Sequence, residues 1–174
     1  MYKDVERRKR YFRRILKSNI DVAIVAQFYV DDDWPIVVIP ESKVDSTAEI
    51  ETDDGDLIIG DPILDPHLLR IEVKGLQKSF TNEKDWNPSY DEILTYNKKV
   101  YDSYETEPKC LWLINKERTY AAIIPKDTKD QWGIKENVYD KNYGTYTTYY
   151  TCKPEDMIYV KIPEHYVWNT GKVV

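Results

Sequence analysis

The sequence is poor in the residues that build disulfide frameworks and zinc sites. Only two cysteines and two histidines occur among its 174 residues. Cys110 and Cys152 are too few for a disulfide framework, and their positions lack the spacing of metal ligands. We therefore expect each cysteine to lie on or near a strand as a small apolar residue, and we expect no Cys/His zinc chemistry.

Long apolar runs are missing too. No run approaches the roughly 20 residues that a membrane-spanning helix needs. Residues 1–14 are strongly charged and lack the apolar segment of a secretory signal. No internal repeat or low-complexity linker divides the chain. We therefore expect a soluble cytoplasmic protein without a membrane partner, folded as one domain over residues 1–174.

An excess of positive charge, which is common in nucleic-acid-binding proteins, is also missing. The formal net charge is −6 at pH 7, which argues against binding to nucleic acid. Eight basic residues nevertheless lie between positions 3 and 17, where only Asp4 and Glu6 oppose them. Such a basic edge can bind phosphates, although a solvated helix face explains the same run more simply.

The most informative stretch covers residues 56–75 and reads DLIIGDPILDPHLLRIEVKG. Two apolar runs flank a turn rich in Gly, Asp and Pro, which predicts two strands joined by a short connection. Glu72 and Lys74 are two residues apart on the second strand, so their side chains project to one face. Pairing of the strands would bring Asp56 beside them. Two carboxylates and an ammonium group in one small area suit a hard divalent cation and a phosphate.

At these residues the sequence resembles the PD-(D/E)XK nuclease superfamily, the restriction-endonuclease-like enzymes. The family pattern is an acidic residue on one strand, a spacer usually of about ten to thirty residues, and (D/E)-X-K at the end of the next strand. The matching residues here are Asp56 and the tripeptide Glu72-Val73-Lys74. The stretches DGDLII and RIEVKG are similar to the form found in Holliday-junction resolvases.

The acidic position of this pattern has alternatives. Gly55 precedes Asp56 where the family pattern has proline, although many members lack that proline. The pairs Asp61-Pro62 and Asp65-Pro66 lie nearer to Glu72, but both are typical of a turn, so we favour Asp56 at the start of a strand. Glu-X-Lys also occurs by chance on exposed strands. The apolar strand before Glu72 and the acidic strand start upstream argue against chance here.

The resemblance implies an α/β fold with a restriction-endonuclease-like core, in which helices flank a mixed central β-sheet. It implies a metal-dependent endonuclease that hydrolyses phosphodiester bonds in DNA, with Mg²⁺ or Mn²⁺ as cofactor. Asp56, Glu72 and the backbone carbonyl of Val73 would bind the metal, and Lys74 would assist the attacking water. Nearby carboxylates favour the charged form of Lys74, so it suits electrostatic stabilisation better than the role of a free base.

The basic N-terminal segment predicts a helix over residues 3–18, with Asn19 as its end. Members of the family often carry an acidic residue on the first helix that joins the metal site, and Glu6 is the candidate catalytic residue at that place. An ion pair with Arg10 at i, i+4 explains Glu6 equally well. The candidate nucleic-acid-binding residues are Arg7, Arg10, Arg14 and Lys78.

The other patterns predict further strands and one further helix. We expect strands over residues 21–30, 34–39, 109–114, 119–124 and 157–162, a turn at 31–33 and a candidate strand at 48–51. Ser89 and Glu92 form the pattern of a capping box before apolar residues at helical spacing, which predicts a helix over residues 89–104. The resemblance places Asn97 or Lys98 of that helix near the site, although an exposed face is the simpler interpretation.

The C-terminal region is rich in tyrosine and threonine, which favour strands. We expect a hairpin within residues 130–151, as part of a Tyr-rich β extension at about 130–174. Tyrosines stack on unpaired bases, but a half-buried sheet face is the commoner use of such residues.

Two other functions are consistent with the sequence. One is a catalytically inactive module on the same fold that binds nucleic acid or another protein. The other is an α/β protein without a nucleic-acid role, for which the net charge of −6 is the main argument. Within the nuclease hypothesis, DNA or RNA and linear or branched substrates are all open. Many members of the family act as dimers, so a homodimer is open as well.

Overall fold

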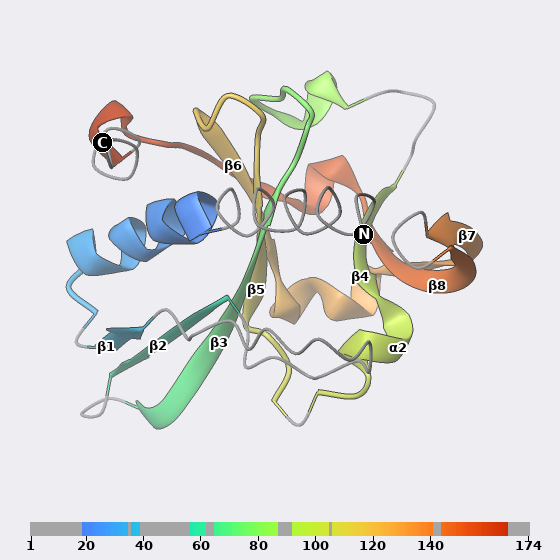
Figure 1. Ribbon diagram of the computed structural model, residues 1–174, viewed down its shortest axis with the longest axis horizontal. Helices are drawn as coiled ribbons and strands as arrows, with labels where there is room; N and C mark the ends of the chain where they lie inside the picture. Colours follow the sequence, from blue (N-terminus) through green and yellow to red (C-terminus); the bar gives the residue numbers. More distant parts are fainter. Residues whose placement is uncertain are drawn as a thin grey trace, which may run out of the picture.

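The computed structural model describes residues 19–34, 36–38, 56–61, 65–86, 92–104, 106–140 and 144–166. These residues form a mixed α/β fold with a six-stranded sheet, here called the central sheet, and a three-stranded second sheet (Figure 1). The predicted α/β class with a mixed central sheet is confirmed at this level. Among the described residues, no helix combines the length and apolar character needed to cross a bilayer.

The central sheet has the strand order β1-β2-β3-β5-β6-β9. Its neighbours are antiparallel except for β3 and β5, which run parallel. All five residues of β5 are buried, as expected for a strand covered on both faces of a sheet. The strands are β1 (Ile36–Val38), β2 (Leu57–Asp61), β3 (Asp65–Gly75), β5 (Cys110–Ile114), β6 (Tyr120–Pro125) and β9 (Ile158–Lys161).

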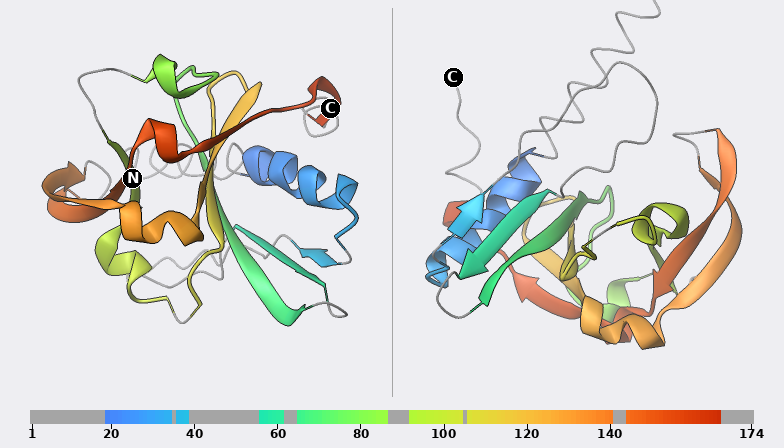
Figure 2. Two further views of the ribbon diagram at one scale, coloured as in Figure 1. Left: turned by 180° about the vertical axis from the view of Figure 1, so that it is seen from behind. Right: turned by 90° about the horizontal axis from the view of Figure 1, so that it is seen from below.

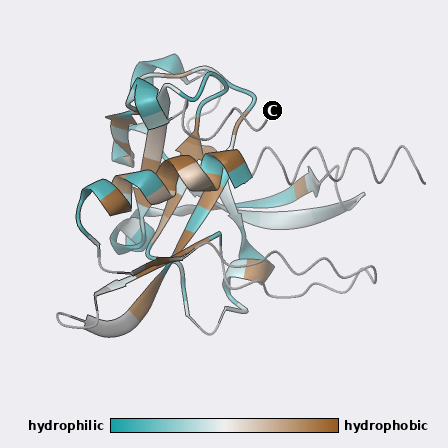
Figure 3. Cartoon of the chain, turned by 60° about the vertical axis from the view of Figure 1, so that its left-hand side comes forward, coloured by the Kyte–Doolittle hydropathy of each residue, from teal (hydrophilic) through white to brown (hydrophobic). Residues whose placement is uncertain are grey.

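A helix over residues 19–31, blue in Figure 1, covers one face of the central sheet. Its buried residues Val22, Val25 and Ala26 follow the i, i+3, i+4 spacing of one helical face and pack in a core with Leu57 and Ile71. Figure 3 shows apolar residues, in brown, on this helix and on the strands beneath it. This core fixes the helix on the sheet.

The strand predicted over residues 21–30 is therefore wrong, and so is the helix end at Asn19, which is itself helical. The run DVAIVAQFYV is apolar at most positions, and periodicity cannot distinguish a buried helix from a buried strand in such a run. Its length was the missed signal, because ten residues exceed most strands. The turn expected at residues 31–33 is present at residues 32 and 33, directly after the helix. The predicted helix over residues 3–18 and the candidate strand at 48–51 lie outside the described residues.

Strands β2 and β3 pair as an antiparallel hairpin, as predicted from the stretch 56–75. Leu57 pairs with Ile71 and Asp61 pairs with Asp65. The two Asp-Pro pairs are therefore not simply a turn, because Asp61 ends β2 and Asp65-Pro66 begins β3. Proline is tolerated at the first positions of a strand, where a missing N–H need not interrupt the ladder.

The second sheet has the order β4-β8-β7 and is antiparallel throughout. Its strands are β4 (Ile93–Asn97), β7 (Gly133–Asp140) and β8 (Thr145–Cys152), and the short helix α2 (Lys98–Tyr101) follows β4. Strands β7 and β8 form the hairpin expected within residues 130–151. Short 3-10 helices connect the elements at Glu83–Asp85, Lys126–Gln131 and Pro154–Asp156.

The helix predicted over residues 89–104 is wrong for its described part, since residues 93–97 form a strand and helix is limited to 98–101. Ile93 pairs with Cys152 of β8, a partner far along the chain that local periodicity cannot reveal. Glu92, expected in a capping box, instead accepts a hydrogen bond from the Thr151 hydroxyl. The cap of α2 is Asn97, whose side chain accepts from the Val100 N–H.

A second core lies between the two sheets. Alternate residues of β5 divide between the cores: Trp112 packs under the helix, whereas Leu111 and Leu113 pack toward the second sheet with Tyr96 and Tyr101. Figure 2 shows the helix and the β7–β8 hairpin on opposite sides of the central sheet. Both cysteines are free and buried, one in β5 and one in β8, as expected of small apolar residues.

Candidate functional site

The β2–β3 hairpin brings Asp56 to the Glu72-Val73-Lys74 tripeptide. Because Leu57 pairs with Ile71, the antiparallel register places Asp56 opposite Glu72. The Val73 N–H donates a hydrogen bond to Asp56 Oδ2 at 2.7 Å. The acidic residue and the tripeptide therefore meet at one end of the hairpin, and together with Arg70 they are called the candidate site below.

Alternation along β3 determines which side chains face the candidate site. Val73 is buried in the core under the helix, so Glu72 and Lys74 project from the opposite face. Glu72 lies opposite Leu111 of the parallel strand β5, and Lys74 lies opposite Leu113. Both leucines belong to the core between the sheets, so Glu72 and Lys74 stand at the rim of that core. The Glu72 side chain is 16% exposed, whereas Lys74 is exposed.

Glu72 has a cationic neighbour that the sequence analysis did not single out. Arg70, two residues earlier on the same face, donates to Glu72 Oε1 from Nε at 2.9 Å and from Nη2 at 2.6 Å. The Arg70 Cζ lies 3.8 Å from the centroid of the Tyr104 ring. The i, i+2 spacing of an arginine and a glutamate on a strand was the signal for this pair.

The charge of Glu72 also reaches the aromatic residues of the second core. Burial, and to a lesser degree the nearby Glu72 charge, raise the pKa of Tyr96. Tyr96 therefore stays protonated, and its ring packs against that of Tyr101 in the core between the sheets, with ring centroids 4.6 Å apart.

Asp21 is a further carboxylate, beside the end of β3, that sequence reasoning missed because the residue was assigned to a strand. It lies on the covering helix, its side chain is 7% exposed, and its Oδ1 accepts from Arg118 Nε at 2.7 Å. A Cβ at position 75 would overlap its carboxylate, so Gly75, directly after Lys74, leaves the space that Asp21 occupies. A lone aspartate in the apolar run 21–30 was the available signal.

The remaining candidates lie elsewhere. Glu6, Arg7, Arg10 and Arg14 lie outside the described residues, so the structure places none of them. Lys78 follows β3, and its Nζ is 5.5 Å from the centroid of the Trp86 ring.

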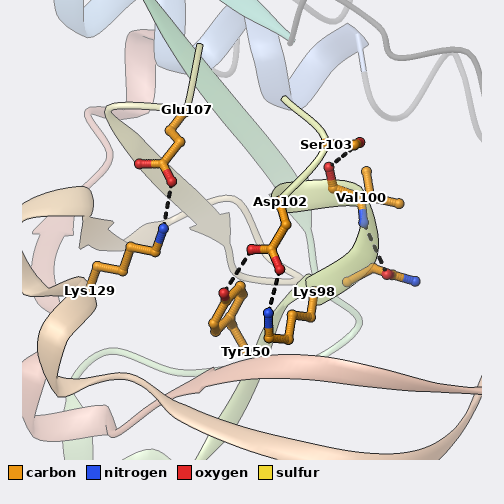
Figure 4. A network of polar contacts seen from close by, with 8 residues as sticks. Lys98, Val100, Asp102, Ser103, Glu107, Lys129 and Tyr150 are labelled. Atoms are coloured by element: carbon orange, nitrogen blue, oxygen red, sulfur yellow. Dashed lines mark hydrogen bonds and ion pairs between the residues drawn. The ribbon is translucent and has the colours of Figure 1, made fainter. Parts of the chain in front are cut away.

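Asn97 ends strand β4 of the second sheet, and Lys98 begins α2 directly after it. Asn97 Nδ2 donates to Thr147 Oγ1 at 3.3 Å, and Lys98 is paired with Asp102. Figure 4 shows Lys98 in a group here called the lysine network, which lies beside α2. Its members are Lys98, Asp102, Glu107, Lys126, Lys129 and Tyr150.

The donor atoms of the candidate site fit a hard divalent cation by type. Two carboxylates and a backbone carbonyl are oxygen ligands of the kind that Mg²⁺ and Mn²⁺ accept, and Mg²⁺ keeps several waters besides. Within the part of the chain that the structure describes, no group of three or more His, Cys, Asp or Glu residues is suited to hold a metal. Asp56 and Glu72 therefore offer a two-carboxylate set, with Arg70 on one of its oxygens.

The chain matches no protein-family model, no curated protein and no solved structure. The interpretation of the candidate site therefore depends on its own residues and on the strands that position them.

Proposed function

We propose that this protein is a Mg²⁺- or Mn²⁺-dependent endodeoxyribonuclease of the PD-(D/E)XK type. Asp56, Glu72 and the Val73 carbonyl are the metal ligands in this proposal, and Lys74 assists the attacking water. The observation that carries it is the hydrogen bond from the Val73 N–H to Asp56 Oδ2 at 2.7 Å. It joins the acidic strand start to the Glu-X-Lys strand, which is the juxtaposition that this chemistry requires.

The order of the elements supports a restriction-endonuclease-like core. The resemblance implies that the chain leaves the Glu-X-Lys strand, forms a helix and returns to the same sheet. β5 returns beside β3 and parallel to it, after a crossover that contains α2. This crossover departs from the family expectation, because it also contains β4 and has only a four-residue helix.

The residues divide the work of phosphodiester hydrolysis. A bound divalent cation would lower the pKa of the water bound to it and neutralise charge on the phosphate. Asp56 and Glu72 are the carboxylates that hold it, and the β2–β3 ladder keeps them opposed. Lys74 is exposed at the same face, where its ammonium orients water and stabilises negative charge in the transition state.

The decisive experiment compares two half-buried glutamates. Mn²⁺ is titrated calorimetrically into wild type, Glu72→Gln and Glu107→Gln, and each sample is then incubated with linear, branched and single-stranded DNA. Glu107 is the matched control, since it is a carboxylate paired with lysines in the lysine network. We expect Glu72→Gln to lose Mn²⁺ binding and cleavage, and Glu107→Gln to keep both. Cleavage by Glu72→Gln at the wild-type rate would refute the assignment.

A second candidate function is a catalytically inactive DNA-binding module on the same fold. The observation that favours it is the pairing of Glu72 with Arg70, which puts a fixed cation on the carboxylate that a metal would need. This candidate predicts binding to DNA that is unaffected by Mg²⁺ and weakens steeply with salt, without cleavage. A protein with no nucleic-acid role would show weak affinity that is insensitive to salt.

The oligomeric state belongs to the nuclease proposal as well. Cutting two strands is simplest with two sites, so we expect a homodimer on duplex DNA. Sedimentation of the protein with and without a short duplex measures this directly, and a monomer on cleaved duplex would contradict it.

A further inference from the structure

The β7–β8 hairpin carries exposed apolar side chains that the nuclease mechanism does not use. Six large apolar side chains are exposed among the described residues, and three of them lie on this hairpin: Ile134 is 55% exposed, Tyr139 53% and Tyr146 68%. Tyr139 pairs with Tyr146 across the two strands, and their ring centroids lie 5.3 Å apart. Among the described residues, neither ring contacts any other ring. The two rings therefore form an aromatic pair that is open to solvent.

The three exposed side chains share one face of the hairpin. Tyr146 and Tyr150 are four residues apart on β8, so they point to the same side of the strand. The register places Tyr139 opposite Tyr146 and Ile134 opposite Tyr150, and opposed residues of paired strands share a face. Tyr150 packs against the core between the sheets, whereas the Tyr146 end of β8 is exposed. Ile134, Tyr139 and Tyr146, here called the tyrosine face, thus continue the side of the sheet that faces this core.

The outer part of the hairpin has only two strands in the part of the chain that the structure describes. β4 pairs with β8 only as far as Tyr149, so residues 145–147 of β8 pair with β7 alone. Figure 2 shows the hairpin extending away from the central sheet. A two-stranded ribbon is at best marginally stable in water, and packing against a further surface stabilises it. Covering the tyrosine face therefore lowers the free energy of the hairpin.

The edge of β7 is less suited to a partner than the tyrosine face. The register shifts between Lys135 and Val138, and Asn137 has a φ of 55°, which marks a β-bulge in β7. Bulges and charged residues prevent strands from pairing edge to edge, and Lys135 and Glu136 lie at this bulge. A partner would therefore pack on the tyrosine face and would not extend the sheet.

The composition of the tyrosine face fits a protein partner better than a nucleic acid. The cores of protein interfaces are rich in tyrosine and poor in charge, and the tyrosine face has no charged residue. Nucleic acid binds largely through basic residues that contact its phosphates. β7 and β8 together contain one basic residue, Lys135, and two acidic ones, Glu136 and Asp140. The hairpin therefore offers little to a phosphate backbone.

A second copy of the chain is the protein partner that the area and the charge of the tyrosine face fit. Each copy has a net charge of −6, but uncharged faces meet across a two-fold axis without like charges in contact. At about 200 Å² for a tyrosine side chain, Tyr139 and Tyr146 expose roughly 240 Å² together. Two such faces with Ile134 bury less than the roughly 1,200 Å² at which stable interfaces begin. This area suits a weak, reversible dimer.

We propose that the tyrosine face is the contact surface of a weak homodimer, in which the β7–β8 hairpins of two copies pack face to face. The inference goes beyond the proposed nuclease function, because it concerns the protein without metal or DNA. It assigns a surface to self-association, whereas the nuclease proposal depends on Asp56, Glu72 and Lys74. Failure of one proposal therefore leaves the other standing.

The first test is sedimentation equilibrium in chelator and without DNA, at protein concentrations up to about 1 mM. We compare wild type, the double variant Tyr139→Thr/Tyr146→Thr, and Ile158→Thr. Threonine keeps the preference for strand. Ile158 is the matched control, because it is 53% exposed but lies on β9 of the central sheet. We expect wild type to dimerise with a Kd weaker than about 1 μM, the double variant to dimerise at least about tenfold more weakly, and Ile158→Thr to match wild type.

Three results would overturn the homodimer. Wild type that stays monomeric over the whole range would exclude it. Equal weakening in the double variant and in Ile158→Thr would show association through any exposed apolar residue. Binding of a single-stranded oligothymidylate that the double variant loses, with self-association unchanged, would mean that the tyrosines stack on unpaired bases.

The double variant risks loosening the hairpin, so thermal melting accompanies the sedimentation and a second measurement uses wild type alone. Amide N–H resonances are recorded from dilute to concentrated protein. Those of residues 133–140 and 144–150 should shift with concentration, and those of β1 and β2 should stay fixed. Concentration-dependent shifts on another surface, with the hairpin unchanged, would overturn the assignment of the tyrosine face.

Discussion

Two regions of the molecule combine a carboxylate with a cation that lies over a tyrosine ring. In the candidate site, Arg70 holds Glu72 and covers the ring of Tyr104. In the lysine network, Lys129 holds Glu107 and lies over a second tyrosine ring. The residue types are nearly the same, so composition alone does not distinguish a functional arrangement from a structural one.

The two regions differ in how their carboxylates and cations are grouped. Glu107 also pairs with Lys126 at 2.8 Å, and these two lysines, Lys126 first, lower the pKa of the Glu107 carboxyl. One carboxylate there satisfies two cations. In the candidate site, two carboxylates on paired strands share the space, since Asp56 stands opposite Glu72. Two carboxylates opposed on a ladder can hold a further cation together, whereas one carboxylate that already satisfies two lysines cannot.

The largest expected effect is on the rate of DNA cleavage, when one lysine is removed from the candidate site and, as a control, one from the lysine network. Lys74→Gln should lower the DNA cleavage rate about 10²- to 10³-fold, the usual loss when one preorganised electrostatic group is removed. Mn²⁺ affinity should change little, because Lys74 is not a metal ligand. Lys126→Gln removes the same charge and should leave cleavage as in wild type. Single-turnover cleavage assays measure both, and equal losses in the two variants would erase the distinction between the regions.

Glycine-to-alanine changes compare how rigidly two further carboxylates, Asp21 beside β3 and Glu92 beside β8, are held. At Gly75 a Cβ would overlap Asp21, a short side chain held by Arg118. At Gly133 a Cβ would meet Thr151 Oγ1 and the carboxylate end of Glu92, but less closely than a Cβ at position 75 would meet Asp21, and the longer Glu92 side chain can move aside. We expect Gly75→Ala to lower the free energy of unfolding by about 1–3 kcal/mol, as overpacking does.

Gly133→Ala should cost less than Gly75→Ala. Urea denaturation of both variants decides this, with the m value checked for unchanged unfolding behaviour. Equal losses would mean that Asp21 is no more firmly held than Glu92.

The same contrast explains what the sequence could and could not predict. The β2–β3 hairpin follows from apolar runs around a turn, and the meeting of Asp56 with Glu72 follows from that hairpin's register. β5 and β6 could be predicted from the sequence equally well, because they are joined by a short turn and pair with each other. Local pattern was sufficient wherever neighbouring strands pair with each other.

Local pattern failed where a distant partner decides the structure. β4 has apolar residues at helical spacing, but β8 pairs with it and makes it a strand. The helix over residues 19–31 carries too many apolar residues for its periodicity to be seen, because the central sheet buries one side of it. Both errors hid neighbours of the candidate site, since Asp21 lies on that helix and Tyr104, whose ring contacts Arg70, follows α2.

The lysine network should show a small and strongly pH-dependent contribution to stability. The pKa of Glu107 is lowered in the folded protein, chiefly by Lys126 and then by Lys129. A lowered folded-state pKa stabilises the fold above the unfolded value of about 4.3 and loses that stabilisation as the pH falls through the folded pKa. The pairs are partly exposed, so we expect less than about 1 kcal/mol.

Thermal melting of wild type and Glu107→Gln between pH 7 and pH 3 measures this contribution. The difference in Tm between the two proteins should be largest near pH 7 and shrink toward pH 3. A difference that is constant with pH would show that Glu107 acts through packing and not through its charge.

Two tyrosine hydroxyls in the lysine-network region differ in their hydrogen bonding. Among the described residues, the Tyr101 hydroxyl is buried and has no hydrogen-bond partner, whereas Tyr150 donates to Asp102 Oδ1 at 2.8 Å. Tyr101→Phe removes an unsatisfied polar atom and keeps the ring beneath Lys129, so stability should be unchanged or rise by up to about 1 kcal/mol. Tyr150→Phe breaks a hydrogen bond to a charged acceptor and should lower stability by about 1 kcal/mol. Urea denaturation orders the two variants. A loss in Tyr101→Phe as large as that in Tyr150→Phe would mean that the Tyr101 hydroxyl has a partner in solution.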